Sequence, residues 1–188
     1  MRKLFVTEFV SLDGVMEAPG GEPDYPHTGW AFDFHTPEQE QWKLRETLES
    51  EALLLGRKTY EGFSQAWPGR AGEFADKMNA MPKYVASTTL TDPEWENTTV
   101  LEGDVPAAVA ELKGGEGGPI QVPGSQTLVH TLLNHGLVDE LVLMVLPVIL
   151  GSGKRVFPEG PDKTTLRLVD TERFDSGVLV HTYAAATD

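Results

Sequence analysis

Glycines, hydroxyl residues and positive charges follow an apolar run in 53-LLLGRKTYEGF-63. Gly56 permits a tight turn, and Thr59 can cap a helix whose start offers free N–H groups and partial positive charge. Two cations stand between them, in a chain that is strongly acidic. This combination is typical of an anion site, most naturally for phosphate. The alternative is an ordinary capped helix whose cations pair with a nearby acid: Glu49, Glu51 or Glu61.

Hydroxyl residues follow two further apolar runs. The trio 87-STT-89 comes after 83-KYVA-86 and could bond to a ribose or phosphate, although a turn explains it as well. In 120-IQVPGSQTL-128, a Pro-Gly-Ser sequence separates a strand pattern from a helix pattern. The N–H groups of residues 125–127 would point outward there and could hold a pyrophosphate. The alternative is that Ser125 is simply the N-cap of the helix.

Two anion-suited helix starts are one more than a mononucleotide needs, which favours a dinucleotide with its bridging phosphates.

Other motifs do not fit. The GEGGP sequence precedes a strand pattern instead of following one, and LGSGKR lacks the spacing of a phosphate-binding P-loop. His130 and His135 are five residues apart on a helix pattern, so they face different directions, and no metal site is expected.

Strand patterns alternate with helix patterns around these stretches. This alternation predicts a mainly parallel sheet, in which ligands bind at the carboxyl ends of the strands, with an antiparallel hairpin at the C-terminus. Thr36 and Pro37 are typical of a helix start. We expect strands at residues 3–10, 52–55, 84–87, 99–101, 120–122, 141–150, 166–170 and 178–184, and helices at residues 36–50, 59–65, 71–79, 105–112 and 125–135.

Two segments have special features. The run 141-LVLMVLPVIL-150 is apolar throughout, which predicts a strand covered on both faces near the sheet centre. Pro147 cannot donate a ladder hydrogen bond and marks a bulge or the end of pairing. The longest irregular stretch, residues 17–35, carries Trp30 and Phe32, which either stack on a flat substrate ring or pack beneath the loop.

Composition limits the function classes. The 188 residues suffice for one domain, expected to span 1–188. The net charge of −14 argues against general nucleic-acid binding. No apolar run approaches the roughly 18 residues of a membrane helix, and the absence of cysteine excludes disulfides and thiolate metal sites. We therefore expect a cytoplasmic protein that acts on a small molecule, without nucleic-acid or membrane partners.

Four stretches resemble the dihydrofolate reductase superfamily, in particular the branch with the reductase domain of the bifunctional riboflavin-biosynthesis deaminase/reductase: SLDGVM (11–16), LLLGRKTYEGF (53–63), KYVASTTL (83–90) and residues 120–157. The resemblance implies an α/β dihydrofolate reductase-like fold: a mixed, mainly parallel central sheet of about eight strands, flanked by helices and ending in an antiparallel hairpin. It implies NADPH as cofactor and a homodimer. The deaminase half is excluded because it needs cysteine ligands.

The resemblance also assigns roles to individual residues. Relatives often carry Gly-Gly, joined by a cis bond in dihydrofolate reductases, where this chain has Gly124-Ser125. The implied cofactor contacts are Gly56, Arg57, Lys58 and Thr59 on phosphates, with Arg57 on the 2′-phosphate; Ser87 and Thr88 by the adenosine ribose; Gly124, Ser125, Gln126 and Thr127 on the pyrophosphate; and Val15 and Met16 by the nicotinamide.

Substrate contacts follow from the same resemblance. Dihydrofolate reductase binds its pterin through a carboxylate on the first long helix, where this chain offers Glu38, with Trp42 one turn further, or else Gln39. Trp30 and Phe32 are the expected stacking residues. Asp13 is the carboxylate nearest the expected nicotinamide edge and could orient substrate or relay a proton, or be simply a turn residue.

The expected function is an NADPH-dependent reductase that delivers hydride to a C=N or C=O carbon of a small polar substrate. The riboflavin branch implies a ribosylaminopyrimidine phosphate. The alternatives are a nucleotide-binding or sensing protein of the same fold without turnover, and a dihydrofolate reductase proper.

Overall fold

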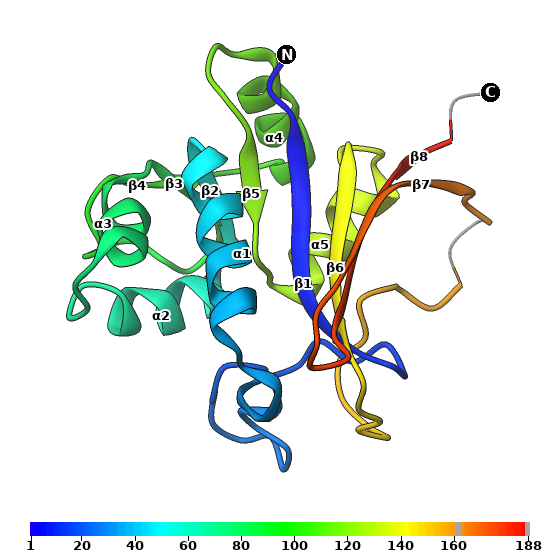
Figure 1. The fold of residues 1–188 in the computed structure, drawn as a ribbon. Helices are drawn as coiled ribbons and strands as arrows, with labels where there is room; N and C mark the ends of the chain where they lie inside the picture. The colour runs from blue at the N-terminus through cyan, green and yellow to red at the C-terminus, as the bar shows by residue number, and fades with distance from the viewer. Residues whose placement is uncertain (161–162, 187–188) are drawn as a thin grey trace.

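The computed structural model describes residues 1–160 and 163–186, and eight strands of these residues form one sheet (Figure 1). The sheet order is β4-β3-β2-β5-β1-β6-β8-β7. Strands β1 to β6 pair in parallel, whereas β8 runs antiparallel to both β6 and β7. The strands are β1 (Leu4–Ser11), β2 (Ala52–Gly56), β3 (Lys83–Ala86), β4 (Thr98–Leu101), β5 (Ile120–Val122), β6 (Glu140–Leu146), β7 (Leu166–Arg173) and β8 (Leu179–Ala185). The expected mixed, mainly parallel sheet with a terminal hairpin is confirmed.

Five α-helices and one 3-10 helix flank this sheet. Helix α1 crosses one face, in front in Figure 1, while α4 and α5 lie behind the sheet. The helices are α1 (Pro37–Glu49), α2 (Arg57–Ala66), α3 (Glu73–Ala80), α4 (Val105–Gly114), α5 (Gln126–Asn134) and the 3-10 helix Trp30–Phe34. Among the described residues, no helix is both long and apolar enough to cross a membrane.

Alternate residues of the central strands supply both faces of the core. Leu141 and Leu143 of β6 belong to the cluster on the α4 and α5 side, whereas Val142 and Met144 pack on the opposite side. Leu141 to Met144 are all buried, so both faces of β6 are covered, and the prediction from its continuous apolar run is confirmed.

Several boundaries differ from the sequence expectation for local reasons. Strand β6 ends at Leu146 instead of residue 150, because pairing stops at Pro147. Neither helix nor strand occurs in residues 147–160 and 163–165, the described part of the connection to β7. Helix α2 begins at Arg57 with Gly56 in the N-cap position, so Thr59 lies inside the helix and does not cap it. The predicted cap of α1 is confirmed, since Thr36 accepts a hydrogen bond from the Gln39 amide.

A buried lysine fastens the β3–β4 edge of the sheet. Lys83 has no exposed surface, and its Nζ donates to three backbone carbonyls, of Asn79 at 2.6 Å, Met81 at 2.8 Å and Glu96 at 3.0 Å. The Nζ also lies 4.3 Å from the centre of the Trp95 ring. One side chain therefore joins the end of α3 to the segment that leads into β4.

We predict that Lys83→Met lowers the free energy of unfolding by about 2–4 kcal/mol, because the variant keeps an apolar stem but leaves three buried carbonyls without their donor. Chemical denaturation measures the change, with Lys163→Met, at an exposed position, as the control. Equal stability of the two variants would show that the three hydrogen bonds contribute nothing net.

Candidate functional site

A cleft of about 510 Å³ lies at the carboxyl ends of β2, β3 and β5, between the starts of α2 and α5. The two helix starts that the sequence marked as anion sites therefore face the same cleft. Most of the residues predicted to bind cofactor line it: Gly56, Arg57, Lys58, Ser87, Thr88, Ser125, Gln126 and Thr127.

Two glycines allow these helix starts to touch. Strands β2 and β5 are neighbours, which brings Gly56 so close to Ser125 that a Cβ on Gly56 would lie 2.2 Å from the Ser125 Oγ. Gly124 has φ of +103°, and a Cβ there would lie 2.9 Å from the Thr59 Oγ1. The Thr59 and Ser125 hydroxyls are hydrogen-bonded at 2.9 Å, and the Gly124–Ser125 peptide bond is cis. Thr59 and Gly124 thus hold the two helix starts together and do not line the cleft.

At both helix starts, no capping side chain accepts a hydrogen bond from the first backbone N–H groups. Neither α2 nor α5 has a side-chain cap, whereas Thr36 caps α1 and Asp104 caps α4. Ser125 is the N-cap residue of α5, as the alternative had it, but its hydroxyl bonds to Thr59 and makes no cap hydrogen bond to the helix. Uncapped N–H groups with a partial positive charge remain available to an anion in the cleft.

Three cations surround the cleft in this acidic chain. Arg57 forms an ion pair with Glu61 at 2.6 Å, one of the pairings considered from the sequence. Lys58 lines the cleft and makes no ion pair with any residue that the structure describes. Lys154 reaches the cleft from the loop after β6, and its Nζ lies 3.0 Å from a Glu17 carboxylate oxygen.

Sequence reasoning missed Lys154. The LGSGKR stretch, which contains Lys154, does not have the spacing of a P-loop. A usable signal was present, because this basic, glycine-rich stretch follows the most apolar strand of the chain. In a parallel sheet such a stretch must emerge at the ligand-binding edge.

Asp13 is a structural anchor. Its carboxylate accepts hydrogen bonds from the Ser11 hydroxyl at 2.6 Å and from the Leu150 and Gly151 amides at 3.1 and 2.8 Å. These bonds, that of Ser11 foremost, lower the pKa of Asp13 to about 2. A carboxylate with this pKa is ionised near neutral pH and acts as an acceptor, which disfavours the proton-relay role. Asp13 instead fastens the loop after β1 to the loop after β6.

Val15 and Met16 strengthen the same junction. Val15 is fully buried and forms an isolated bridge with Arg155, and the Met16 amide donates to the Lys154 carbonyl at 2.8 Å. Neither side chain lines the cleft. Their contribution is to fix the backbone that carries Lys154.

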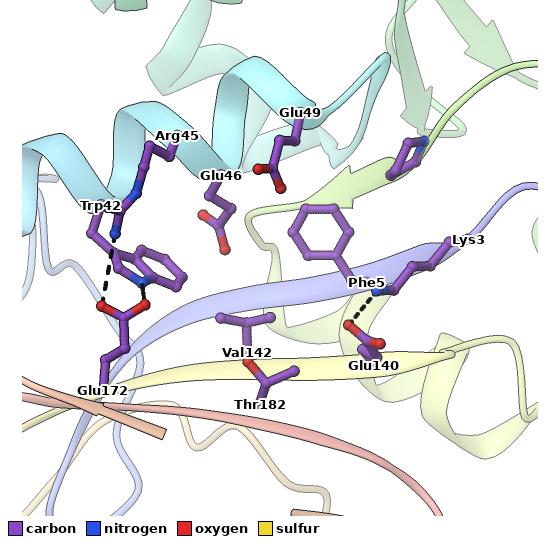
Figure 2. Close-up of a pocket in the computed structure, with 11 residues that line it drawn as sticks. Lys3, Phe5, Trp42, Arg45, Glu46, Glu49, Glu140, Val142, Glu172 and Thr182 are labelled. Carbon is purple, nitrogen blue, oxygen red and sulfur yellow. Dashed lines mark hydrogen bonds and ion pairs between the residues drawn. The ribbon is translucent and has the colours of Figure 1, made fainter. Parts of the chain in front are cut away.

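None of the four predicted substrate residues lines the cleft. Trp30 is only 4% exposed, and its indole N–H donates to the Glu17 carbonyl at 2.8 Å, so it packs beneath its loop, as the alternative reading had it. Phe32 and Glu38 are exposed. Trp42 donates to Glu172 at 3.0 Å and lines a different cavity (Figure 2). In contrast, Gln39 is buried, and its Oε1 has no hydrogen-bond partner among the described residues.

A buried acid lies under the cleft. Glu8 of β1 is 6% exposed, and its Oε1, which has no hydrogen-bond partner among the residues described, lies 3.9 Å from the point where a Gly124 Cβ would be. Burial raises the pKa of Glu8 well above its usual value, while the charge of Lys43 opposes this shift. No pattern in the sequence distinguishes this residue from the other acids. Separately, no cluster of three or more metal-ligand side chains occurs in the described ranges.

We predict that Glu8→Gln raises stability at pH 8 by about 1 kcal/mol or more, and that this gain shrinks as the pH falls toward about 5. The pKa is raised in the folded state, so the unfolded chain releases this proton first, and wild-type stability falls as the pH rises above about 4.5. Chemical denaturation from pH 5 to 8.5 measures the difference. A gain that is constant with pH would contradict the raised pKa.

Comparisons with known proteins match most of the chain. The model of the RibD C-terminal domain family matches residues 2–180. The uncharacterized protein YyaP of Bacillus subtilis (strain 168) is 30% identical over 192 residues, which cover 97% of this chain and 94% of YyaP.

Solved structures share the fold. A protein of Shewanella sp. PV-4 assigned to riboflavin biosynthesis superposes with a TM-score of 0.75 at 21% identity, covering 98% of this chain and 99% of that one. Dihydrofolate reductase of Enterococcus faecalis, solved with NADP(H), gives 0.65 at 18% identity over 98% and 97% of the two chains. The expected dihydrofolate reductase-like fold is confirmed.

Proposed function

The chain belongs to the RibD C-terminal domain family, and from this membership and the cleft we propose that it is an NADPH-dependent reductase. One observation carries the proposal: two uncapped helix starts open side by side into one cleft that three cations border. A dinucleotide with several phosphates suits such a cleft better than a neutral ligand does.

The described residues fit this cofactor. Gly124 lets the start of α5 lie close to Thr59 of α2, and the α5 start beside it offers amides to a pyrophosphate. Arg57 and Lys58 at the α2 start supply charge for a 2′-phosphate, and Ser87 and Thr88 supply hydroxyls for a ribose. The E. faecalis reductase of the same fold was solved with NADP(H), which supports the choice. When bound, NADPH supplies the hydride.

The substrate that we propose is a small polar molecule with a C=N or C=O group, and a ribosylaminopyrimidine phosphate is the leading candidate. The family and the Shewanella protein both point to riboflavin biosynthesis. The free Oε1 of Gln39 can accept an N–H from a pyrimidine, and the Lys43 ammonium, which donates to the Thr7 hydroxyl at 2.6 Å, lies 5.1 Å from the centre of the Phe9 ring of β1. A neutral amide at Gln39 attracts a protonated pterin less than a carboxylate would, which disfavours dihydrofolate.

Turnover tests the function directly. We expect the protein to oxidise NADPH when the ribosylaminopyrimidine phosphate is added, and to leave dihydrofolate nearly untouched; loss of reduced-nicotinamide absorbance follows both reactions. Binding of NADPH without oxidation across carbonyl, imine and pterin substrates would favour the sensing protein instead. Failure to bind NADPH would overturn both hypotheses.

Arg57 provides a prediction on cofactor choice. Arg57→Ala should raise the dissociation constant for NADPH about tenfold and leave that for NADH nearly unchanged, because a charged hydrogen bond to the 2′-phosphate is lost. Titration followed by fluorescence measures both constants. The matched control is Arg167→Ala, at an exposed position on β7. An equal loss for the two cofactors would show that Arg57 does not contact the 2′-phosphate.

A further inference from the structure

A buried acid that the proposed reaction does not use lies close to the start of α5. In the parallel register of β1 and β5, Val6 pairs with Val122. Two residues further along both strands, the Glu8 Oε1 lies 3.9 Å from the point where a Gly124 Cβ would be. Gly124 directly precedes Ser125, the N-cap residue of α5. The carboxyl group of Glu8 is therefore next to the helix start that offers its amides to a pyrophosphate.

The side chain of Glu8 is on the α5 side of the sheet. Alternate residues of a strand point to opposite faces, and both Val6 and Val10 belong to the core cluster on the α4 and α5 side. Thr7, whose hydroxyl accepts a hydrogen bond from Lys43 of α1, lies on the other side. Glu8 is 6% exposed, and its Oε1 is buried without a hydrogen-bond partner among the described residues. Glu8 thus influences the cleft through its charge, without contact to a ligand.

Two charges of α1 act on this carboxyl group. Burial raises the pKa of Glu8 well above its usual value, the charge of Lys43 lowers this pKa, and the charge of Glu46 raises it. Glu46 accepts a hydrogen bond from Lys43 at 2.9 Å and points from α1 toward the sheet (Figure 2). Uncharged groups lie on the other sides: Leu143 of β6 pairs with Glu8, and the Thr59 hydroxyl of α2 approaches the same glycine.

An ionised Glu8 would oppose an anion at the α5 start. The uncapped amides of this helix carry a partial positive charge of about half an elementary charge. A carboxylate beside them would offset this charge and repel a phosphate, and salt screens buried charges only weakly. A neutral Glu8 leaves the positive potential to the ligand. Protonation of Glu8 and binding of an anion therefore favour each other.

We propose that NADPH binding in the cleft is coupled to a proton on Glu8, so that the cofactor binds tightly when this carboxyl group is neutral and weakly when it is ionised. The proton comes from solvent and stays on Glu8 while the cofactor is bound. Glu8 is a positioning residue in this scheme, since it touches neither cofactor nor substrate. The inference rests on the proposed function, because it needs a phosphate at the α5 start.

Cofactor binding as a function of pH tests this coupling. Between pH 6 and 9.5, the dissociation constant of the wild-type protein for NADPH should rise about tenfold relative to that of Glu8→Gln, which stays neutral. NADH should show the same difference, because it carries the pyrophosphate without the 2′-phosphate. Titration followed by fluorescence measures the constants. Glu111→Gln, at an exposed position on α4, is the control and should follow the wild type.

Proton uptake is a second readout. At a pH where the affinities of wild type and Glu8→Gln differ, calorimetry in HEPES and in Tris should give different binding enthalpies for the wild type, because binding takes a proton from the buffer. The variant should give nearly equal enthalpies in the two buffers.

Two α1 variants should shift the pH profile in opposite directions. Lys43→Met removes the charge that lowers the pKa of Glu8, so binding should weaken only at a higher pH than in the wild type. Glu46→Gln removes the charge that raises this pKa, so binding should weaken at a lower pH. These variants keep the test decisive if Glu8→Gln does not fold.

Identical pH profiles of wild type and Glu8→Gln would overturn the inference and leave the proposed function intact. Equal proton uptake by these two proteins, or shifts of the profile in the same direction in both α1 variants, would do the same. If none of the proteins binds NADPH at any pH, the proposed function is wrong and the coupling falls with it.

Discussion

The contact between Gly56 and Ser125 determines the shape of the cleft at the starts of α2 and α5. Any side chain at Gly56 would overlap the Ser125 hydroxyl, and any side chain at Gly124 would crowd Thr59. Only because these two positions lack a Cβ can the starts of α2 and α5 meet above neighbouring strands. Their N–H groups then face a shared cleft, and the hydroxyl pair of Thr59 and Ser125 fixes the spacing between them. The positive potential in this cleft thus comes largely from backbone N–H groups. An acidic protein can therefore offer an anion site with few cations.

The loops complete the site by fastening to one another. Asp13 holds the loop after β1 to the loop after β6 through two backbone amides, and the bridge between Val15 and Arg155 continues the junction. Lys154 reaches the cleft from this joined backbone. A carboxylate with a lowered pKa is suited to this task, since it remains a pure acceptor over the whole physiological pH range. The hydrogen bonds of Asp13 hold the two loops in place beside the site.

Short-range patterns in the sequence predicted the fold well. They could not predict which side chains from distant segments lie next to one another in the folded protein. The Thr36 cap, the alternation of strands and helices and the apolar run of β6 all rest on short-range patterns, and each is present in the structure. The helix starts near Gly56 and Ser125 were recognised for the same reason, although the first helix was predicted to begin at Thr59, two residues too late. Glu8 and Lys154 were missed because their importance arises from burial and from contacts with distant segments. The end of β6 was placed too late because hydrophobicity continues past Pro147 after pairing has stopped.

The cleft between the starts of α2 and α5 draws its walls from β2, β3, β4, α2, α4, α5 and the loop that carries Lys154, so its lining runs from Gly56 to Lys154. Such a site exists only when the sheet is assembled, so a partly folded chain presents no half-formed version of it. Occupancy of the cleft and survival of the native state are therefore thermodynamically linked. When the ligand is abundant in the cell, its binding would protect the whole protein from proteolysis. When the ligand is depleted, the protein would be degraded faster, although none of its residues has changed.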